Sequence, residues 1–168
     1  MITMPRSIAI IVGLVVGLIV IPLVHGVLPW ALSTRLARYG WAEGSPGYWN
    51  WIGLMVVAPA VALLIWILVF AIPQAPSKVK LGLTPSFLMM RGPYRLTRNP
   101  MYVAELGLWL GLGIYFGSLG VLLGFLVLWS VVKCIILPRE ERGLERAFGQ
   151  TYLEYKNRVP RWFWKTNN

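Results

Sequence analysis

The chain has 168 residues, of which 57% are hydrophobic and only 13% are charged, and its net charge is +10. An average soluble domain carries roughly 25% charged residues, so this composition excludes an ordinary soluble domain, and its hydrophobicity excludes a disordered tail. The chain has one cysteine, one histidine and no aspartate. A metal centre built from protein ligands is therefore hard to assemble.

Three long apolar stretches indicate membrane spans. Ser7–Leu32 and Tyr48–Ile72 each exceed the roughly 20 residues that a helix needs to cross a bilayer. Tyr102–Leu137 is too long for one span, and we interpret it as two spans joined by a tight turn near Gly117. The sequence thus predicts an all-α fold, a polytopic membrane bundle of about four spans with a C-terminal helical hairpin.

Basic residues are concentrated in segments that four spans would place on one side of the membrane. The positive-inside rule then puts both termini and the Pro73–Asn99 loop in the cytoplasm. A short chain without a targeting peptide suits a prokaryotic inner membrane. The basic tail with Trp162 and Trp164 could suggest nucleic-acid binding, but beside a span it more simply contacts anionic lipid headgroups, so no nucleic-acid partner is expected.

A polar segment with one apolar stripe follows the last span. Pro138 fits the first turn of a new helix, and residues 139–158 are expected to form one amphipathic helix on the cytoplasmic surface, capping the bundle. Its apolar face would hold Leu144, Phe148, Tyr152 and Tyr155. Glu140 and Glu141 lie in its first turn, where carboxylates either stabilise the helix dipole or contribute to a site.

A second group of polar residues enters the third span. Arg98, Tyr102, Glu105 and Trp109 recur at helical spacing, which predicts one polar and aromatic stripe. A carboxylate inside a span is costly unless it is paired or faces water, so Glu105 is a functional candidate. The structural alternative is a Glu105 bound to Arg98, Arg95 or a backbone N–H. His25 is expected to be a satisfied interfacial histidine.

Five short motifs occur in order across the C-terminal half. Together they resemble the isoprenylcysteine carboxyl methyltransferase family and its phospholipid N-methyltransferase relatives, over roughly Met90 to Trp164. The motifs are Gly92-Pro93-Tyr94, Arg98-Asn99-Pro100-Met101-Tyr102, Glu140-Glu141, Phe148-Gly149-x-x-Tyr152-x-x-Tyr155 and Val159-Pro160-Arg161. The resemblance divides the chain into two N-terminal transmembrane helices, residues 1–72, and an S-adenosylmethionine-binding region, residues 73–168.

This resemblance implies an enzyme that binds S-adenosylmethionine at the cytoplasmic side and receives a lipophilic methyl acceptor from the bilayer. Asn99 stands where the carboxyl methyltransferase pattern has histidine, so the acceptor stays open between an isoprenylcysteine-type carboxylate and a phospholipid amine. The residues implied to border the cofactor are Tyr94, Arg95, Arg98, Asn99, Pro100, Tyr102, Glu140, Glu141 and Tyr152.

The chemistry of these side chains is compatible with that role. Arg98 or Arg95 can bind the carboxylate of the cofactor, and Glu140 or Glu141 can accept hydrogen bonds from its ribose or ammonium group. The candidate catalytic residues are Arg98, Glu105 and Glu141. A carboxylate acceptor needs no general base, whereas an amine acceptor must lose a proton, for which Glu105 or one of the Glu pair is the candidate.

Two other functions are compatible with such a bundle. One is a membrane reductase of related architecture that uses NADPH, although no additional basic loop for its phosphate stands out. The other is a noncatalytic membrane scaffold, which should tolerate the loss of Arg98 and of both glutamates.

Overall fold

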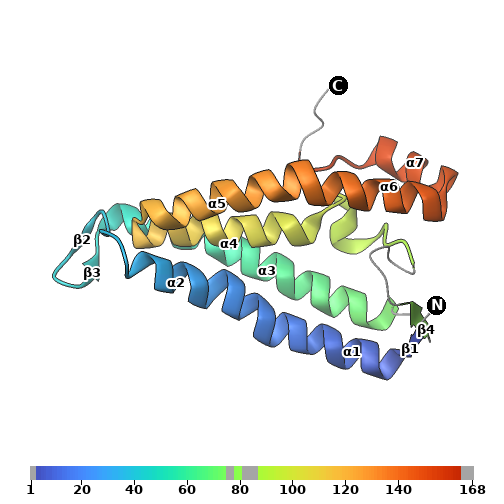
Figure 1. Ribbon diagram of the computed structural model, residues 1–168, viewed down its shortest axis with the longest axis horizontal. Coiled ribbons are helices and arrows are strands. Elements are labelled where there is room, and N and C mark those ends of the chain that lie inside the picture. Colours follow the sequence, from blue (N-terminus) through green and yellow to red (C-terminus); the bar gives the residue numbers. More distant parts are fainter. Residues whose placement is uncertain (1–2, 75–77, 81–86, 164–168) are drawn as a thin grey trace.

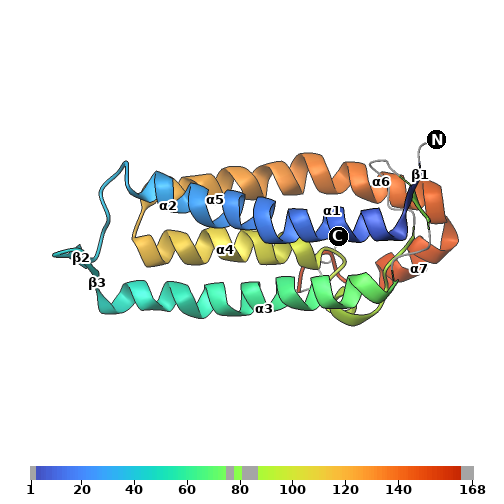
Figure 2. The ribbon, with the colours of Figure 1, turned by 90° about the horizontal axis from the view of Figure 1, so that it is seen from below.

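The structure, a computed structural model, describes residues 3–74, 78–80 and 87–163 and is almost entirely helical. Four helical rods run side by side along the long axis (Figures 1 and 2). Three of them, Arg6–Ser33, Tyr48–Gln74 and Leu119–Phe148, are long and apolar enough to cross a membrane, and the shorter Pro100–Phe116 is also apolar. The chain is therefore an all-α integral membrane protein, as its sequence predicts.

The first rod is one continuous helix with two π-helical turns. It consists of α1 (Arg6–Val15), the π turns η1 (Val16–Val20) and η2 (Leu23–Val27), and α2 (Leu28–Ser33). A short strand, β1 (Thr3–Pro5), precedes it and pairs with β4 (Lys78–Lys80). Arg6 also donates to the carbonyls of Ile72 and Pro73, which ties the start of this rod to the end of the second.

The second and third rods pack closely along their length. They are α3 (Trp51–Gln74), which follows a single 3-10 turn η3 (Tyr48–Asn50), and α4 (Pro100–Phe116). Gly53 and Gly111 face one another across the two helices, and a Cβ on either residue would collide with the opposite helix. Small residues permit such close approach, which matters in lipid because no hydrophobic force drives helices together.

The predicted hairpin in the membrane is confirmed. α4 ends at Phe116 and is followed by Gly117, which has a φ of +57°. α5 (Leu119–Val131) begins directly after Ser118, whose hydroxyl accepts from the Val121 N–H. A side chain at Gly117 would strike the backbone of Tyr39, so both the conformation and the space require glycine. α4 contacts the first rod, α3 and α5, which makes it the central helix of the bundle.

The predicted amphipathic helix is present, but it is continuous with the span before it and shorter than expected. α5 continues through a π turn, η5 (Val132–Ile136), into α6 (Leu137–Phe148), so Pro138 lies inside a single long helix. The wider π turn before Pro138 accommodates a ring that would otherwise clash with the preceding turn. The helix instead breaks at Gly149, with a φ of +51°, and α7 (Gln150–Arg158) folds back beside it (Figure 1).

The bundle has two chemically different ends. One end, which we call the charged end, carries α6, α7, β1, β4 and the start of α4 (Figure 1). The opposite end carries the loop hairpin of β2 (Trp41–Ala42) and β3 (Ser45–Pro46) and the turn at Gly117. This arrangement gathers the basic residues of α6 and α7 with those of the loop before α4, as the charge pattern of the sequence predicts.

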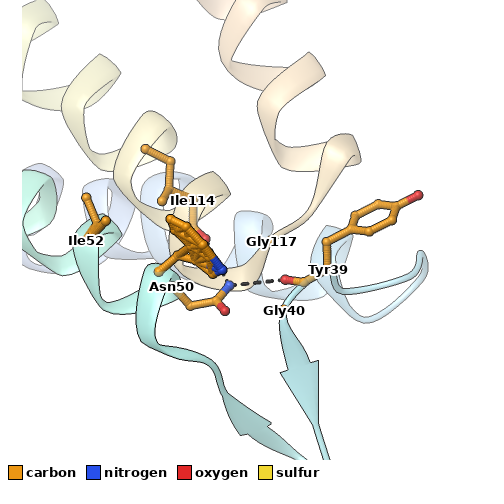
Figure 3. Close-up of a pocket in the computed structure, with 7 residues that line it drawn as sticks. Tyr39, Gly40, Asn50, Ile52, Ile114 and Gly117 are labelled. Carbon is orange, nitrogen blue, oxygen red and sulfur yellow. Dashed lines mark hydrogen bonds between the residues drawn. The ribbon is translucent and has the colours of Figure 1, made fainter.

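A hollow of about 300 Å³ lies at the opposite end and is organised by Asn50 (Figure 3). The Asn50 side-chain amide donates to the carbonyls of Tyr39 and Tyr115, and its oxygen accepts from the Gly47 N–H. These bonds fasten the loop at residues 39–47 to the end of α4. The hollow is thus a feature of the turn region, remote from the charged end.

The end of the loop between α3 and α4 packs against the bundle just before α4. A 3-10 turn, η4 (Gly92–Arg95), places Gly92 against the ring of Phe70, and Pro93 is buried. Parts of the Pro73–Asn99 loop, at residues 75–77 and 81–86, and Trp164 in the basic tail lie outside the described residues.

Candidate functional site

The C-terminal strap, residues 159–161, holds the loop that leads into α4. The N–H of Arg98 donates to the carbonyl of Pro160 at 2.9 Å. The Thr97 hydroxyl and the Asn99 side-chain amide both donate to the carbonyl of Arg161, at 2.7 and 3.1 Å. Thr97 is fully buried. Main-chain and side-chain bonds therefore fix the position of Arg98 and Asn99 before α4 begins.

Glu141 is the centre of a buried ion-pair cluster. Arg161 donates to both of its oxygens, from Nε to Oε1 at 2.9 Å and from Nη2 to Oε2 at 2.6 Å. Arg98 Nη2 lies 3.4 Å from Oε1, and Lys156 Nζ lies 3.7 Å from Oε2. The hydrogen bond to Glu141 raises the pKa of Arg161 above its ordinary value. This is a charge-assisted, bidentate pair of the strong type.

Arg98 carries hydrogen-bonding capacity that the described part of the chain leaves unused. Its side chain is only 9% exposed, and its Nη2 group faces Glu141. Its Nε and Nη1 atoms are buried and have no hydrogen-bond partner among the described residues. A buried donor without an acceptor costs free energy, on the order of 1–3 kcal/mol and more when it is charged. Such donors fit a planar anion such as a carboxylate.

A second carboxylate of α6 contacts α4. The Tyr102 hydroxyl donates to Glu140 Oε1 at 2.7 Å, which joins the first turn of α4 to the first turn of α6. Tyr94 lies near this pair. Burial raises the pKa of its phenol, and the nearby negative charge of Glu140 raises that pKa further. The Tyr155 hydroxyl donates to the carbonyl of Tyr94 at 2.7 Å.

The two tyrosines of α7 are buried against this cluster. Tyr152 is 2% exposed and Tyr155 is 3% exposed. Burial, with a further contribution from the charge of Glu141, raises the pKa of Tyr152 to about 12. Burial also raises the pKa of Tyr155. Both side chains are therefore neutral phenols near neutral pH. They share the α7 face predicted for them, but Gly149 separates that face from Leu144 and Phe148.

The structure brings together most of the residues named from the sequence. Arg98, Asn99, Tyr102 and both glutamates of α6 converge at the charged end, with Tyr94 and Tyr152 beside them. Pro100 is buried as the first residue of α4. Arg95 differs, because its side chain is exposed on η4. Arg98 precedes α4, so the helical stripe predicted to start there starts at Tyr102.

Glu105 does not pair with Arg98, which instead faces Glu141. Its Oε1 atom lies 3.9 Å from Nε2 of His25, on the first rod. The prediction that His25 has its hydrogen-bonding capacity satisfied is confirmed. His25 is 8% exposed and lies inside the bundle, where its Nδ1 accepts from Trp109 Nε1 at 3.0 Å. The polar face of α4 thus continues inward through Glu105 and Trp109.

Three residues that contact Glu141 or the strap were not identified as site residues from the sequence. Arg161 appears in the sequence only as the end of a short motif, and Thr97 and Lys156 carry no spacing signal. Their contacts to Glu141 and to the loop before α4 arise because α7 folds back on α6. The one signal in the sequence was the position of Arg161, a basic residue directly after Pro160 at the end of the last helix.

Comparisons with known proteins identify a family for most of the chain. Residues 48–151, well over half of the chain, match the sequence profile of the phospholipid methyltransferase family. The chain is also similar to the cobalt-zinc-cadmium resistance protein CzcN of Cupriavidus metallidurans, with 36% identity over 76 residues. That match covers 45% of this chain and 35% of the relative, so it spans about a third of the relative's length. No solved structure matches.

Proposed function

Because the chain belongs to the phospholipid methyltransferase family, we propose that it transfers a methyl group from S-adenosylmethionine to a lipophilic acceptor at the charged end of the bundle. The observation that carries this proposal is Arg98, whose Nε and Nη1 groups are buried and unpartnered among the described residues. The carboxylate of an amino-acid cofactor is the kind of group that satisfies such donors.

The residues around Arg98 fit the remaining groups of such a cofactor. Glu140 can accept hydrogen bonds from a ribose diol or an ammonium group, and the Tyr102 hydroxyl keeps it in place. Asn99 can donate and accept, and Tyr94 and Tyr152 supply aromatic walls. When bound, S-adenosylmethionine supplies a methyl group activated by a sulfonium.

We assign Glu141 a positioning role rather than a catalytic one. Arg161 engages both of its oxygens, and Lys156 and Arg98 add further positive charge. Glu141 therefore orients Arg98 and anchors the strap, while its own lone pairs are already used. Glu105 is the carboxylate that we propose to accept a proton when the methyl acceptor is an amine.

The position of the site at the charged end of the bundle bears on the methyl acceptor and on the orientation of the protein in the membrane. A site at the end of a bundle of apolar rods can receive a lipophilic acceptor sideways from the bilayer, either an isoprenylcysteine-type carboxylate or a phospholipid amine. We propose that the charged end, with both termini, is cytoplasmic in a prokaryotic inner membrane. The exposed groove on α6 would then contact anionic lipid headgroups; it is lined by Arg139, Arg142, Glu145 and Arg146.

Isothermal titration of the protein in nanodiscs tests the proposal. We expect saturable binding of S-adenosylmethionine and of its demethylated product. Arg98→Ala should weaken it by about 2 kcal/mol, roughly thirtyfold, because it removes a charged hydrogen-bond donor. Arg95→Ala is the matched control, since Arg95 is an exposed neighbour on η4.

Folding should survive Arg98→Ala, because Glu141 keeps its bidentate bond from Arg161. Absence of saturable binding by the wild-type protein would reject the cofactor. Equal affinities of the Arg98→Ala and Arg95→Ala variants would reject the site. Mass spectrometry of lipid extracts incubated with labelled S-adenosylmethionine would then identify the acceptor.

A further inference from the structure

The only histidine of the chain lies inside the bundle, on a segment that the family match does not cover. His25 belongs to the π turn η2, whereas the matched residues begin at 48. It is 8% exposed and faces α4. A π turn changes which side of a helix a residue occupies, and such turns are frequent at functional sites. His25 is therefore a candidate for a role that the matched region cannot supply alone.

The contact with Trp109 determines the protonation pattern of His25. An indole N–H can only donate, so Nδ1 of His25 must accept, and the proton of the neutral imidazole resides on Nε2. The Trp109 ring in turn packs against Gly124 of α5, where a Cβ would collide with it. Packing from α5 thus fixes the indole, and the indole fixes the orientation of the imidazole.

The Nε2 atom of His25 faces Glu105, with 3.9 Å between Nε2 and Oε1. Glu105 is 12% exposed, and a carboxylate inside a span is costly unless a donor or a cation compensates it. Three elements that pack against α4, namely α2, α3 and α5, contain no ionisable side chain. The titratable neighbours on the other side are Tyr102, which already donates to Glu140, and Glu140 itself.

We propose that His25 is a positioning residue that keeps Glu105 ionised by presenting its Nε2–H group to the carboxylate. This inference rests on the proposed function, in which Glu105 accepts the proton of an amine acceptor. That proton passes from the acceptor nitrogen to a Glu105 oxygen, which frees the nitrogen lone pair to attack the methyl group. His25 retains its own Nε2 proton throughout, because Trp109 occupies the Nδ1 lone pair. The first span thereby contributes to the chemistry of the site.

The single histidine permits a direct test on the wild-type protein. Nitrogen-15 NMR of the histidine-labelled protein, purified with a tag free of histidine, should show Nδ1 unprotonated and Nε2 protonated. Replacing Glu105→Gln should change the Nε2 shift, because it removes the charge that this group faces. A proton on Nδ1 would overturn the inference. So would an Nε2 chemical shift that is the same in the wild type and in Glu105→Gln. Neither result depends on cofactor binding.

Two amide variants separate positioning from packing. His25→Gln can place an N–H near the former Nε2, whereas His25→Asn can place an oxygen near the former Nδ1 and satisfy only Trp109. Infrared difference spectra, referenced to Glu105→Gln, should show Glu105 ionised at neutral pH in the wild type and in His25→Gln. They should show it protonated in His25→Asn. An ionised Glu105 in a folded His25→Asn variant would contradict the proposal.

The same variants have a kinetic signature. In His25→Asn the acid limb of the rate profile should move from below to above neutral pH, by about two units, which is about a tenfold loss near neutral pH. The affinity for S-adenosylmethionine should match the wild type, and His25→Gln should restore most of the rate. An unshifted profile in His25→Asn would reject the role of His25. Failure of the wild type to bind S-adenosylmethionine would reject the proposed function instead, while the NMR and infrared results would still decide the inference.

Discussion

Arg161, which follows α7 in the chain, donates to both oxygens of Glu141, with donor–acceptor distances of 2.9 and 2.6 Å. The backbone carbonyl of Arg161 accepts hydrogen bonds from the side chains of Thr97 and Asn99. One position of the strap therefore ties α6 to the loop before α4, and Arg98 lies between these two attachments. The geometry of the candidate site depends on this connection as much as on Arg98 itself.

Arg161→Ala should loosen the strap and destabilise the charged end by about 2 kcal/mol, since it leaves the buried Glu141 with weaker partners. Thermal unfolding in nanodiscs and limited proteolysis near residue 159 would measure the effect. Arg158→Ala is the matched control, because Arg158 is exposed on α7. The Glu141→Gln/Arg161→Ala double variant should lose less than the sum of the single variants. Equal stability of the Arg161 and Arg158 variants would refute this role.

Tyr102 and Glu140 should behave as one unit in cofactor binding. Tyr102→Phe removes the 2.7 Å hydrogen bond and Glu140→Gln removes the negative charge of its acceptor, so we expect each to weaken S-adenosylmethionine binding by about 1–2 kcal/mol. The double variant should bind about as well as the weaker single variant. Isothermal titration of the complete double-mutant cycle measures the coupling. Losses that simply add would show that the two groups act independently.

The close approach of α3 and α4 predicts opposite outcomes for two glycines. Gly111→Ala should destabilise the bundle by about 1–3 kcal/mol, because its Cβ would meet the Gly53 carbonyl and the Val57 side chain. Gly13→Ala should be neutral or slightly stabilising, because nothing lies within 4 Å of the added Cβ and alanine favours a helix. Unfolding midpoints of both variants test the difference. A Gly111→Ala protein as stable as Gly13→Ala would contradict the described packing.

The raised pKa of Tyr152 predicts its titration behaviour. Its neutral phenol should stabilise the folded protein below pH 10, the ordinary range of tyrosine, and this contribution should be lost as the pH rises through about 12. Ultraviolet titration of the wild type and of Tyr152→Phe would isolate its tyrosinate absorbance. The difference between them should stay near zero until about pH 11. A tyrosinate signal from Tyr152 near pH 10 in the folded protein would show that it is exposed.

Much of the fold could be predicted because membrane spans are determined by local composition. Uninterrupted apolar stretches indicate the helices, and the Gly117-Ser118 step marks the hairpin turn, since only glycine readily adopts its positive φ. The course of α6 could not be predicted. Pro138 normally marks a helix start, and only the π turn at Val132–Ile136 lets the helix continue through it.

The amino-acid sequence by itself determined that this chain is a membrane helix bundle, where its hairpin turns, and that Arg98 and the Glu140-Glu141 pair belong to one candidate site. These features follow from apolar length, glycine and short motifs, which are all local. Only the tertiary structure decided the partners: Arg161 for Glu141, Tyr102 for Glu140, and His25 with Trp109 beside Glu105. Such pairings depend on the rotation of each helix and on the reversal at Gly149, which residue spacing within a single segment does not specify.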